Sequence, residues 1–247
     1  MENFNIKMKL SIVIPCYNEK NRIIKTLNKI NNYIVTRGLK TEIIVVDDGS
    51  QDNTVDKVKN FSAGVPLKTI CFLNNRGKGS AVKRGMLEAT GEFILFTDAD
   101  LSTPIEEYEK LEKYVKKGEY DIAIGSRGLP DSQKLVAQNF FRDKIGKIFG
   151  KLVQLILLPE IKDSQCGFKL FKREAIKDIF CRQTVDGFGF DLEVLVIARK
   201  MGYNIKEVPI LWENSFESKL SPVKDAFFIG YELFKIKVKE ILGHYST

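Results

Sequence analysis

The first half of the chain alternates short apolar runs with longer amphipathic stretches. The apolar runs are rich in β-branched and aromatic residues and cover 10–15, 42–48, 67–73, 92–98 and 120–127. The stretches between them have helical periodicity and cover 21–37, 50–61, 77–89 and 103–118. Strands that are apolar on both faces and alternate with helices predict a parallel sheet with helices on both sides. In the last of these helices, Thr103 is predicted as the N-cap and Pro104 as the first helical residue.

The second half has a different order of elements. The pattern predicts a long amphipathic stretch, a strand, a helix that begins after Gly189, a last strand, and a terminal apolar segment with interspersed lysines; these cover 136–158, 165–171, 189–203, 204–212 and 222–242. The chain contains no internal repeat, low-complexity segment or linker. We therefore predict one α/β domain over residues 1–221, followed by a C-terminal amphipathic segment over residues 222–247.

Composition narrows the possible partners and chemistry. With 247 residues, 44% of them apolar, the chain is large enough to bury a single core. The net charge of +7 fits an anionic partner such as a nucleotide, lipid headgroups or nucleic acid.

The cysteines show no CxxC spacing, which indicates reduced thiols in a cytosolic protein. Because the only histidine is His244, histidine-based acid–base chemistry is nearly excluded. Residues 1–15 lack the apolar run of a signal peptide, and no apolar stretch approaches the roughly 18 residues of a membrane span.

Polar clusters follow each of the first five predicted strands. They read PCYNE, DDGS, NNRGKG, DAD and GSR, at residues 15–19, 47–50, 74–79, 98–100 and 125–127. A single cluster is as well explained by a turn or a helix cap. Ligands of parallel α/β sheets bind beyond the carboxyl ends of the strands, so the five clusters together predict one binding crevice.

The DAD cluster indicates a metal site. Asp98 and Asp100 are one residue apart, and their mutual repulsion needs compensation. Mg²⁺ or Mn²⁺ prefers oxygen ligands and commonly bridges carboxylates to a diphosphate. Arg76 and Lys78 are predicted to contact the same phosphates. The alternative is a turn with two exposed aspartates. The loop is not a phosphate-binding GxxxxGK[ST] sequence, and the first strand carries no GxGxxG, which disfavours a dinucleotide oxidoreductase.

The ordered motifs SIVIPCYNE, VVDDGSQDNT, NRGKGSAVKRGM, TDADLSTP and GSR resemble the family 2 glycosyltransferases, which have the GT-A fold, a Rossmann-like fold for nucleotide-diphosphate sugars. KDSQCGFKLF, FDLEVLVIARKMGY and ESKLSP look like the dolichyl-phosphate β-glucosyltransferases of that family, and slightly less like the dolichyl-phosphate mannosyltransferases. The resemblance covers about residues 9–222. Two features differ: eukaryotic glucosyltransferases have an N-terminal membrane helix that is missing here, and Ser102 stands where some mannosyltransferases have a metal-binding Gln.

The resemblance implies a role for each matching residue on the donor side. Asp48 would contact the nucleotide base, and Asp98 would reach the ribose or the metal ion. Asp100 would be the main metal ligand. Arg76 and Lys78 would approach the donor. The nucleotide pocket would be lined by Pro15, Tyr17 and Glu19.

On the acceptor side, Arg127, Arg142 and Lys169 resemble residues that hold the acceptor phosphate. A solvated helix residue is an equally good interpretation of Arg142. Asp191 occupies the position of the catalytic base in relatives that glycosylate hydroxyl groups.

The implied reaction is an inverting transfer of glucose from UDP-glucose to a polyprenyl phosphate. A phosphate monoester is largely dianionic at neutral pH and is therefore nucleophilic without a strong base. The alternatives are a GDP-mannose donor, a polysaccharide hydroxyl acceptor with Asp191 as base, a nucleotidyltransferase, and, with little support, a nucleic-acid-binding module.

The segments 136–158 and 222–242 combine apolar bulk with lysine, which predicts peripheral contact with the cytoplasmic face of a membrane. Packing on the domain or a dimer contact is the alternative for both segments.

Overall fold

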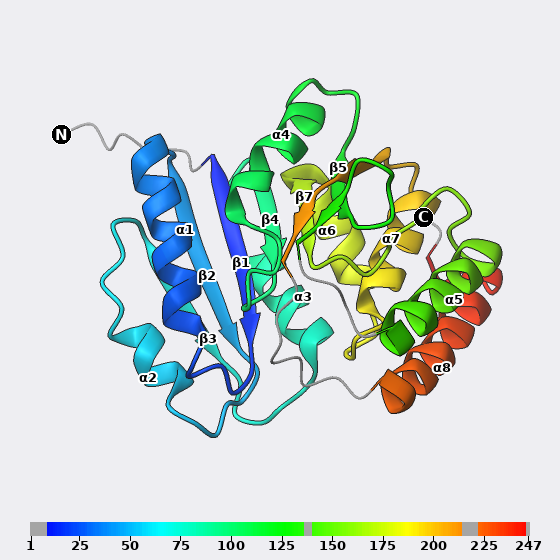
Figure 1. Cartoon of the computed structure of the whole chain (residues 1–247), viewed down its shortest axis with the longest axis horizontal. Helices are drawn as coiled ribbons and strands as arrows, with labels where there is room; N and C mark the ends of the chain where they lie inside the picture. The colour runs from blue at the N-terminus through cyan, green and yellow to red at the C-terminus, as the bar shows by residue number, and fades with distance from the viewer. Residues whose placement is uncertain (1–8, 136–139, 214–221, 246–247) are drawn as a thin grey trace.

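The computed structural model describes residues 9–135, 140–213 and 222–245. A seven-stranded sheet with the order β3-β2-β1-β4-β7-β5-β8 forms its centre, and a small second sheet pairs β6 with β9 (Figure 1). The strands are β1 (Leu10–Cys16), β2 (Thr41–Asp47), β3 (Leu67–Cys71), β4 (Phe93–Thr97), β5 (Ile122–Ser126), β6 (Gln133–Lys134), β7 (Phe168–Lys172), β8 (Ile205–Pro209) and β9 (Leu211–Trp212). The helices are α1 (Ile23–Arg37), α2 (Thr54–Lys59), α3 (Lys78–Glu88), the short 3₁₀ helix η1 (Ile105–Glu107), α4 (Tyr108–Lys116), α5 (Phe140–Ile156), α6 (Arg173–Arg182), α7 (Phe190–Lys200) and α8 (Pro222–Ile241).

The five strands predicted in the first half all form, and the prediction of an α/β fold is confirmed. β1 pairs in parallel with both β2 and β4, and β2 pairs in parallel with β3. The sheet is not wholly parallel, however. β7 lies between β4 and β5 and runs antiparallel to both. The expectation of a parallel sheet is therefore wrong at this position, because a strand from the second half separates two strands of the first.

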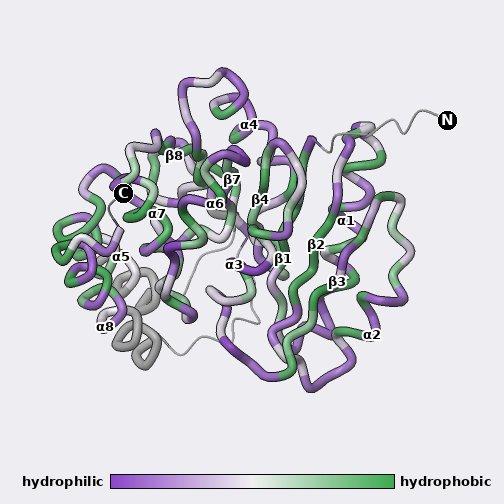
Figure 2. The backbone as a smooth tube through the Cα atoms, turned by 180° about the vertical axis from the view of Figure 1, so that it is seen from behind, coloured by the Kyte–Doolittle hydropathy of each residue, from purple (hydrophilic) through white to green (hydrophobic). Residues whose placement is uncertain are grey.

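Two apolar layers cover the faces of the sheet, as predicted. Along β1, the buried side chains of Ile12 and Ile14 belong to the layer shared with α1, α2 and α4. The intervening Val13 belongs to the layer shared with α3, α6 and α7. This alternation explains why the central strands are apolar at successive positions, as the hydrophobic course of β2 shows (Figure 2).

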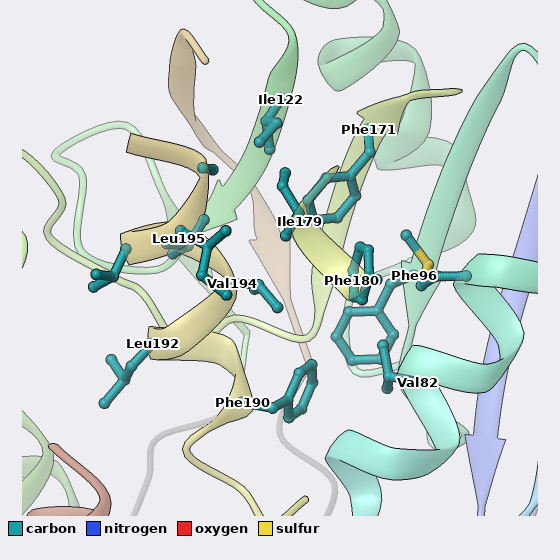
Figure 3. Packing of buried hydrophobic residues seen from close by; sticks show 14 of the residues in the cluster. Val82, Phe96, Ile122, Phe171, Ile179, Phe180, Phe190, Leu192, Val194 and Leu195 are labelled. Atoms are coloured by element: carbon teal, nitrogen blue, oxygen red, sulfur yellow. The ribbon is translucent and has the colours of Figure 1, made fainter. Parts of the chain in front are cut away.

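Aromatic side chains fill the second layer near the end of β4. Phe96 and Phe190 meet edge to face with ring centroids 5.6 Å apart, and Phe171 and Phe180 do the same at 5.5 Å (Figure 3). Such edge-to-face pairs stabilise a core beyond the area they bury. They also place α7 firmly beside the polar end of β4.

The helices α5 and α8 lie side by side on the outer side of α7 (Figure 1). α8 buries Leu233 and Ile236 in the core, and Tyr245 beyond its end is buried as well. From Tyr231 onward, the opposite face exposes the apolar side chains of Tyr231, Phe234, Ile241 and Leu242. The predicted helices of 136–158 and 222–242 are therefore present in α5 and α8, although residues 136–139 and 214–221 lie outside the described residues.

Several local predictions need correction. Pro104 precedes η1 with an extended backbone, so neither it nor Thr103 begins α4, which starts at Tyr108. The predicted last strand over 204–212 is interrupted after Pro209, and its final part pairs with β6 in the second sheet. Helix α6 was not predicted. Within the described ranges, every helix is too short or too polar to cross a bilayer.

Candidate active site

The polar clusters at the ends of β1 and β2 meet, as the sequence predicted. The Asp48 amide donates to the Cys16 carbonyl at 2.8 Å, and the Asn18 amide donates to Ser50 Oγ at 2.8 Å. Pro15 is buried in the last part of β1, and Tyr17 is exposed just beyond it. Hydrogen bonds therefore join the two loops just beyond the ends of β1 and β2.

Glu19 lies in the same loop, next to the start of α1. Its carboxylate pairs with Arg22, whose Nε lies 2.6 Å from Oε2. Its amide donates to Thr54 Oγ1 at 2.8 Å, which connects the loop to α2. Of the three residues predicted to line a nucleotide pocket, Pro15 therefore lies at the end of β1, and Tyr17 and Glu19 lie in the loop that follows it.

Asp48 is buried and holds the basic loop that follows β3. Its carboxylate accepts hydrogen bonds from the amides of Arg76 and Gly77, at 2.8 and 2.9 Å, and from the Asn75 side chain at 2.8 Å. Burial raises the pKa of Asp48, although the two backbone bonds oppose the shift. Asp48 thus positions Arg76, a role that the sequence did not indicate. Its predicted contact with a base stays a prediction.

Lys78, the first residue of α3, lies directly on Asp98. The two charges are 2.7 Å apart, and the ammonium group lies 5.5–5.9 Å from the ring centroids of Phe96, Phe188 and Phe190. Burial alone would lower the pKa of Lys78, but the neighbouring carboxylates, Asp98 first, raise it. Lys78 therefore supplies part of the charge that compensates Asp98.

Asp98 and Asp100 sit in a tight turn at the end of β4. The Asp98 amide donates to the Gly167 carbonyl at 3.2 Å, and a Cβ atom at Gly167 would lie 2.0 Å from Asp98 Oδ2. A side chain at position 167 would therefore displace the Asp98 carboxylate, so the glycine before β7 helps to shape the carboxylate's site. Leu101 completes the turn with a φ of 49°.

Asp100 is half-buried and accepts a hydrogen bond from the Ser102 amide at 3.0 Å. Burial, and secondly the charge of Asp98, raise the pKa of Asp100. Asp100 also lines a pocket of about 150 Å³ with Glu213 and with the basic Lys25 and Lys29 of α1. Among the residues that the structure describes, no three His, Cys, Asp or Glu side chains gather closely enough to hold a metal ion.

Lys169 and Asp191 form a buried ion pair behind this turn. Their charged atoms are 2.5 Å apart, the side chains are 1% and 6% exposed, and Lys169 also donates to the Cys166 carbonyl at 2.5 Å. Burial raises the pKa of Asp191, while Lys169 and Lys78 oppose the shift. Lys169 thus has its partners inside the protein, and its predicted contact with an acceptor phosphate stays a prediction.

Arg127, at the end of β5, is held by Asp163. Nε and one terminal nitrogen of the guanidinium bind the two carboxylate oxygens at 2.7 and 2.8 Å, and the Arg127 amide adds a third bond at 2.8 Å. The ring of Trp212 lies 5.5 Å from the guanidinium carbon. Burial would raise the pKa of Asp163, but the Arg127 charge holds it below the ordinary range. The side chain of Arg142 lies outside the described residues.

Asp163 was missed as a site residue, although it belongs to the KDSQCGFKLF motif. The amides of Lys162 and Asp163 donate to the two carboxylate oxygens of Glu207 at 2.8 Å each, which fixes the loop. The charge of Asp98 acts on both Arg127 and Asp191. One charged cluster therefore brings Lys78 and Asp98 of the predicted donor side together with Arg127, Lys169 and Asp191 of the predicted acceptor side.

The sheet order, and the carboxylates and basic groups beyond the strand ends, define the GT-A class of glycosyltransferase folds, to which the structural neighbours of this chain belong. Glucosyl-3-phosphoglycerate synthase from Mycobacterium tuberculosis in complex with uridine diphosphate has a TM-score of 0.69 and 17% identity, covering 93% of this chain and 80% of that one. Mannosyl-3-phosphoglycerate synthase from Rubrobacter xylanophilus has a TM-score of 0.69 and 18% identity, covering 95% and 74%.

Residues 11–180 match the sequence profile of Glycosyl transferase family 2, and the chain belongs to that family. It is a glycosyltransferase. It is similar to dolichyl-phosphate beta-glucosyltransferase of Drosophila melanogaster, with 35% identity over 96% of this chain and 76% of the relative. The corresponding proteins of Saccharomyces cerevisiae and Homo sapiens are 35% and 33% identical, each over 76% of the relative's length and over 96% and 95% of this chain.

Proposed function

We propose that this enzyme transfers glucose from UDP-glucose to a polyprenyl phosphate of the dolichyl type, with inversion. The relatives named for this activity match nearly the whole chain, which supports the acceptor class and the sugar. A neighbour of the same fold binds uridine diphosphate, which supports the nucleotide.

A divalent cation, Mg²⁺ or Mn²⁺, fits the turn that ends β4. Asp98 and Asp100 would hold it, because burial and, secondly, repulsion from Asp98 raise the pKa of Asp100, and a cation would offset both effects. Two carboxylates alone leave most of its coordination positions to diphosphate oxygens and water. The cation would neutralise negative charge on the departing diphosphate. Lys78, already paired with Asp98, adds a positive charge beside it.

One observation favours a phosphate acceptor over a hydroxyl acceptor. Asp191 is the best candidate for a base, and it is enclosed and paired with Lys169. A hydroxyl nucleophile needs an accessible base to remove its proton. A phosphate dianion does not, and Arg127, fixed by Asp163, is suited to orient it towards the anomeric carbon.

The acceptor is a lipid, so the enzyme has to work at a membrane surface, which we propose is the cytoplasmic face. The exposed face of α8 supports this location, because Phe234 and Ile241 are 64% and 72% exposed. Leu155 of the adjacent α5 is 84% exposed, and the ammonium group of the exposed Lys235 lies 4.4 Å from the ring centroid of the exposed Tyr231. Apolar bulk with lysine suits an interface with anionic lipid, where each lysine contributes about 1 kcal/mol.

The membrane contact is tested with Phe234→Glu and Ile241→Glu in sedimentation with anionic liposomes. Both variants should bind less than the wild type, and binding should weaken at high salt. Val35→Glu on α1 is the matched control, because Val35 is also apolar and exposed. Point substitutions are preferable to deletion of α8, whose Leu233 and Ile236 are part of the core. Equal binding by all variants would contradict an α8 anchor.

The reaction is tested with a panel of UDP- and GDP-sugars, each with a polyprenyl phosphate or the matching polyprenol. We expect a glycolipid from UDP-glucose and the phosphate only, dependent on the divalent ion. Product from GDP-mannose would replace the donor assignment. Product from the polyprenol would replace the acceptor assignment and make Asp191 the candidate base.

A further inference from the structure

The loop between α6 and α7, residues 184–189, packs tightly against the first turn of α3. The Asp186 carbonyl accepts hydrogen bonds from the amides of Gly79 and Ser80 at 2.7 and 3.3 Å, and Ser80 Oγ donates to the Asp186 carboxylate. A Cβ atom at Gly77 would lie 2.3 Å from the same carbonyl oxygen. The amides at the start of α3 are thus already used, and the loop sets the position of the turn that carries Lys78.

The same loop also touches Lys78 directly. The Phe188 ring lies 5.8 Å from the Lys78 ammonium and is 42% exposed. Phe188 therefore packs beside Lys78 and is also partly exposed to solvent. A shift of the loop would move Lys78 relative to Asp98, which lies 2.7 Å away.

α8 contacts the same loop. The Gly189 amide donates to Glu232 Oε2 at 2.7 Å. Cβ atoms at Gly187 and Gly189 would each lie 2.5 Å from the Glu232 carboxylate, so a side chain at either position would displace that carboxylate from the loop. Glu232 is half-buried against the loop and lies on the same helix as the exposed Phe234.

The chain end adds a second attachment. The Tyr245 hydroxyl donates to Glu193 at 2.7 Å, and the Glu193 carboxylate accepts from the amides of Thr184 and Val185, also at 2.7 Å. Glu193 and Tyr245 are fully buried. The C-terminal part of the chain therefore contacts the loop directly at Gly189 and is connected to residues 184–185 through Glu193.

We propose that Glu232 is a positioning residue for the donor: it acts through the 184–189 loop to hold Lys78 at Asp98. The inference rests on the proposed function, because it takes Lys78 as a donor contact. Glu232 itself touches the loop and no reacting group. Loss of one charged hydrogen bond to the loop amide should weaken donor use about tenfold.

The test compares Glu232→Ala with Glu232→Gln. We expect Glu232→Ala to raise the KM for UDP-glucose and the Kd for UDP with Mn²⁺ about tenfold, with the acceptor KM unchanged. Amide hydrogen exchange over 184–189 should become faster. Glu232→Gln should restore most of the affinity, since its side-chain oxygen still accepts from Gly189.

Glu240→Ala is the control, because Glu240 fastens the same helix to Arg199 of α7 and does not touch the loop. It should lower stability without changing the UDP affinity. If Glu232→Ala binds UDP like the wild type, or if Glu240→Ala weakens UDP equally, the inference fails. A wild type that binds UDP with Mn²⁺ but transfers no glucose would refute the proposed function alone.

Discussion

Replacing Lys169 by Met tests the buried ion pair behind the Asp98 turn. Methionine keeps most of the apolar volume beneath Phe96 but leaves the Asp191 carboxylate enclosed without its partner 2.5 Å away. Removing one member of a buried pair costs about 3–5 kcal/mol. Because Lys78 also acts on Asp191, we expect a loss near the lower end, about 3 kcal/mol. For a chain of this size that corresponds to a fall in Tm of roughly 6–12 °C.

The loss should depend on pH. Burial raises the pKa of Asp191, and removal of Lys169 should raise it further. The full loss in the free energy of unfolding is present above the pKa that Asp191 has in the folded variant, where this carboxyl is ionised. It shrinks as the pH falls through that pKa, because the neutral carboxyl is less costly to bury. The variant should therefore be closer to the wild type at pH 5 than at pH 8.

Urea unfolding at both pH values measures the two free-energy differences. Lys172→Met on the same strand is the matched control, since its pair with Asp121, at 3.0 Å, is more exposed. That pair should contribute at most about 1 kcal/mol. A deficit for Lys169→Met as small as that of the control, or one equal at both pH values, would refute this reasoning.

Three further outcomes follow from the same region. Asp100→Asn should abolish nearly all turnover and the effect of Mn²⁺ on UDP affinity without lowering Tm; full activity in excess EDTA would contradict the metal site. Gly167→Ala should weaken UDP binding in the presence of Mn²⁺, measured by calorimetry, because the new Cβ would lie 2.0 Å from Asp98 Oδ2. Asp163→Asn should raise the acceptor KM more than the donor KM. Since the pKa of Asp163 is lowered in the folded protein, its stabilisation is present above about pH 4 and is lost as the pH falls further. The variant's unfolding free energy should therefore change less than the wild type's below pH 4.

The strand segments of the first half, and the placement of Asp98, Asp100 and Lys78 just beyond strand ends, were predictable, because hydrophobic periodicity and the strand-end rule are local signals. The roles of these residues towards a donor stay predictions. The partners of these groups were not predictable. Asp163 is 36 residues from Arg127, and Glu232 is 43 residues from Gly189. A pattern along the chain shows which face of an element is buried but not which distant loop lies against it.

The position of β7 in the sheet could not be predicted for the same reason. Its apolar run identified a strand, but nothing in that run indicates its neighbours or direction. The start of α4 was mispredicted for a local reason. Thr103 and Pro104 have the residue types of a helix start, yet Pro104 is extended and a 3₁₀ turn intervenes before Tyr108.

The insertion of β7 has a consequence for synthesis on the ribosome. β1, β2, β3 and β4 pair with one another and are complete once residue 97 has emerged. β5 pairs in the central sheet with β7 and β8, both of which are translated later. A nascent chain ending before residue 168 therefore carries β5 with both hydrogen-bonding edges unpaired, a state open to association with other strands. Translation pauses between residues 126 and 168 would prolong that state, so the speed of elongation through this interval should govern the yield of folded enzyme.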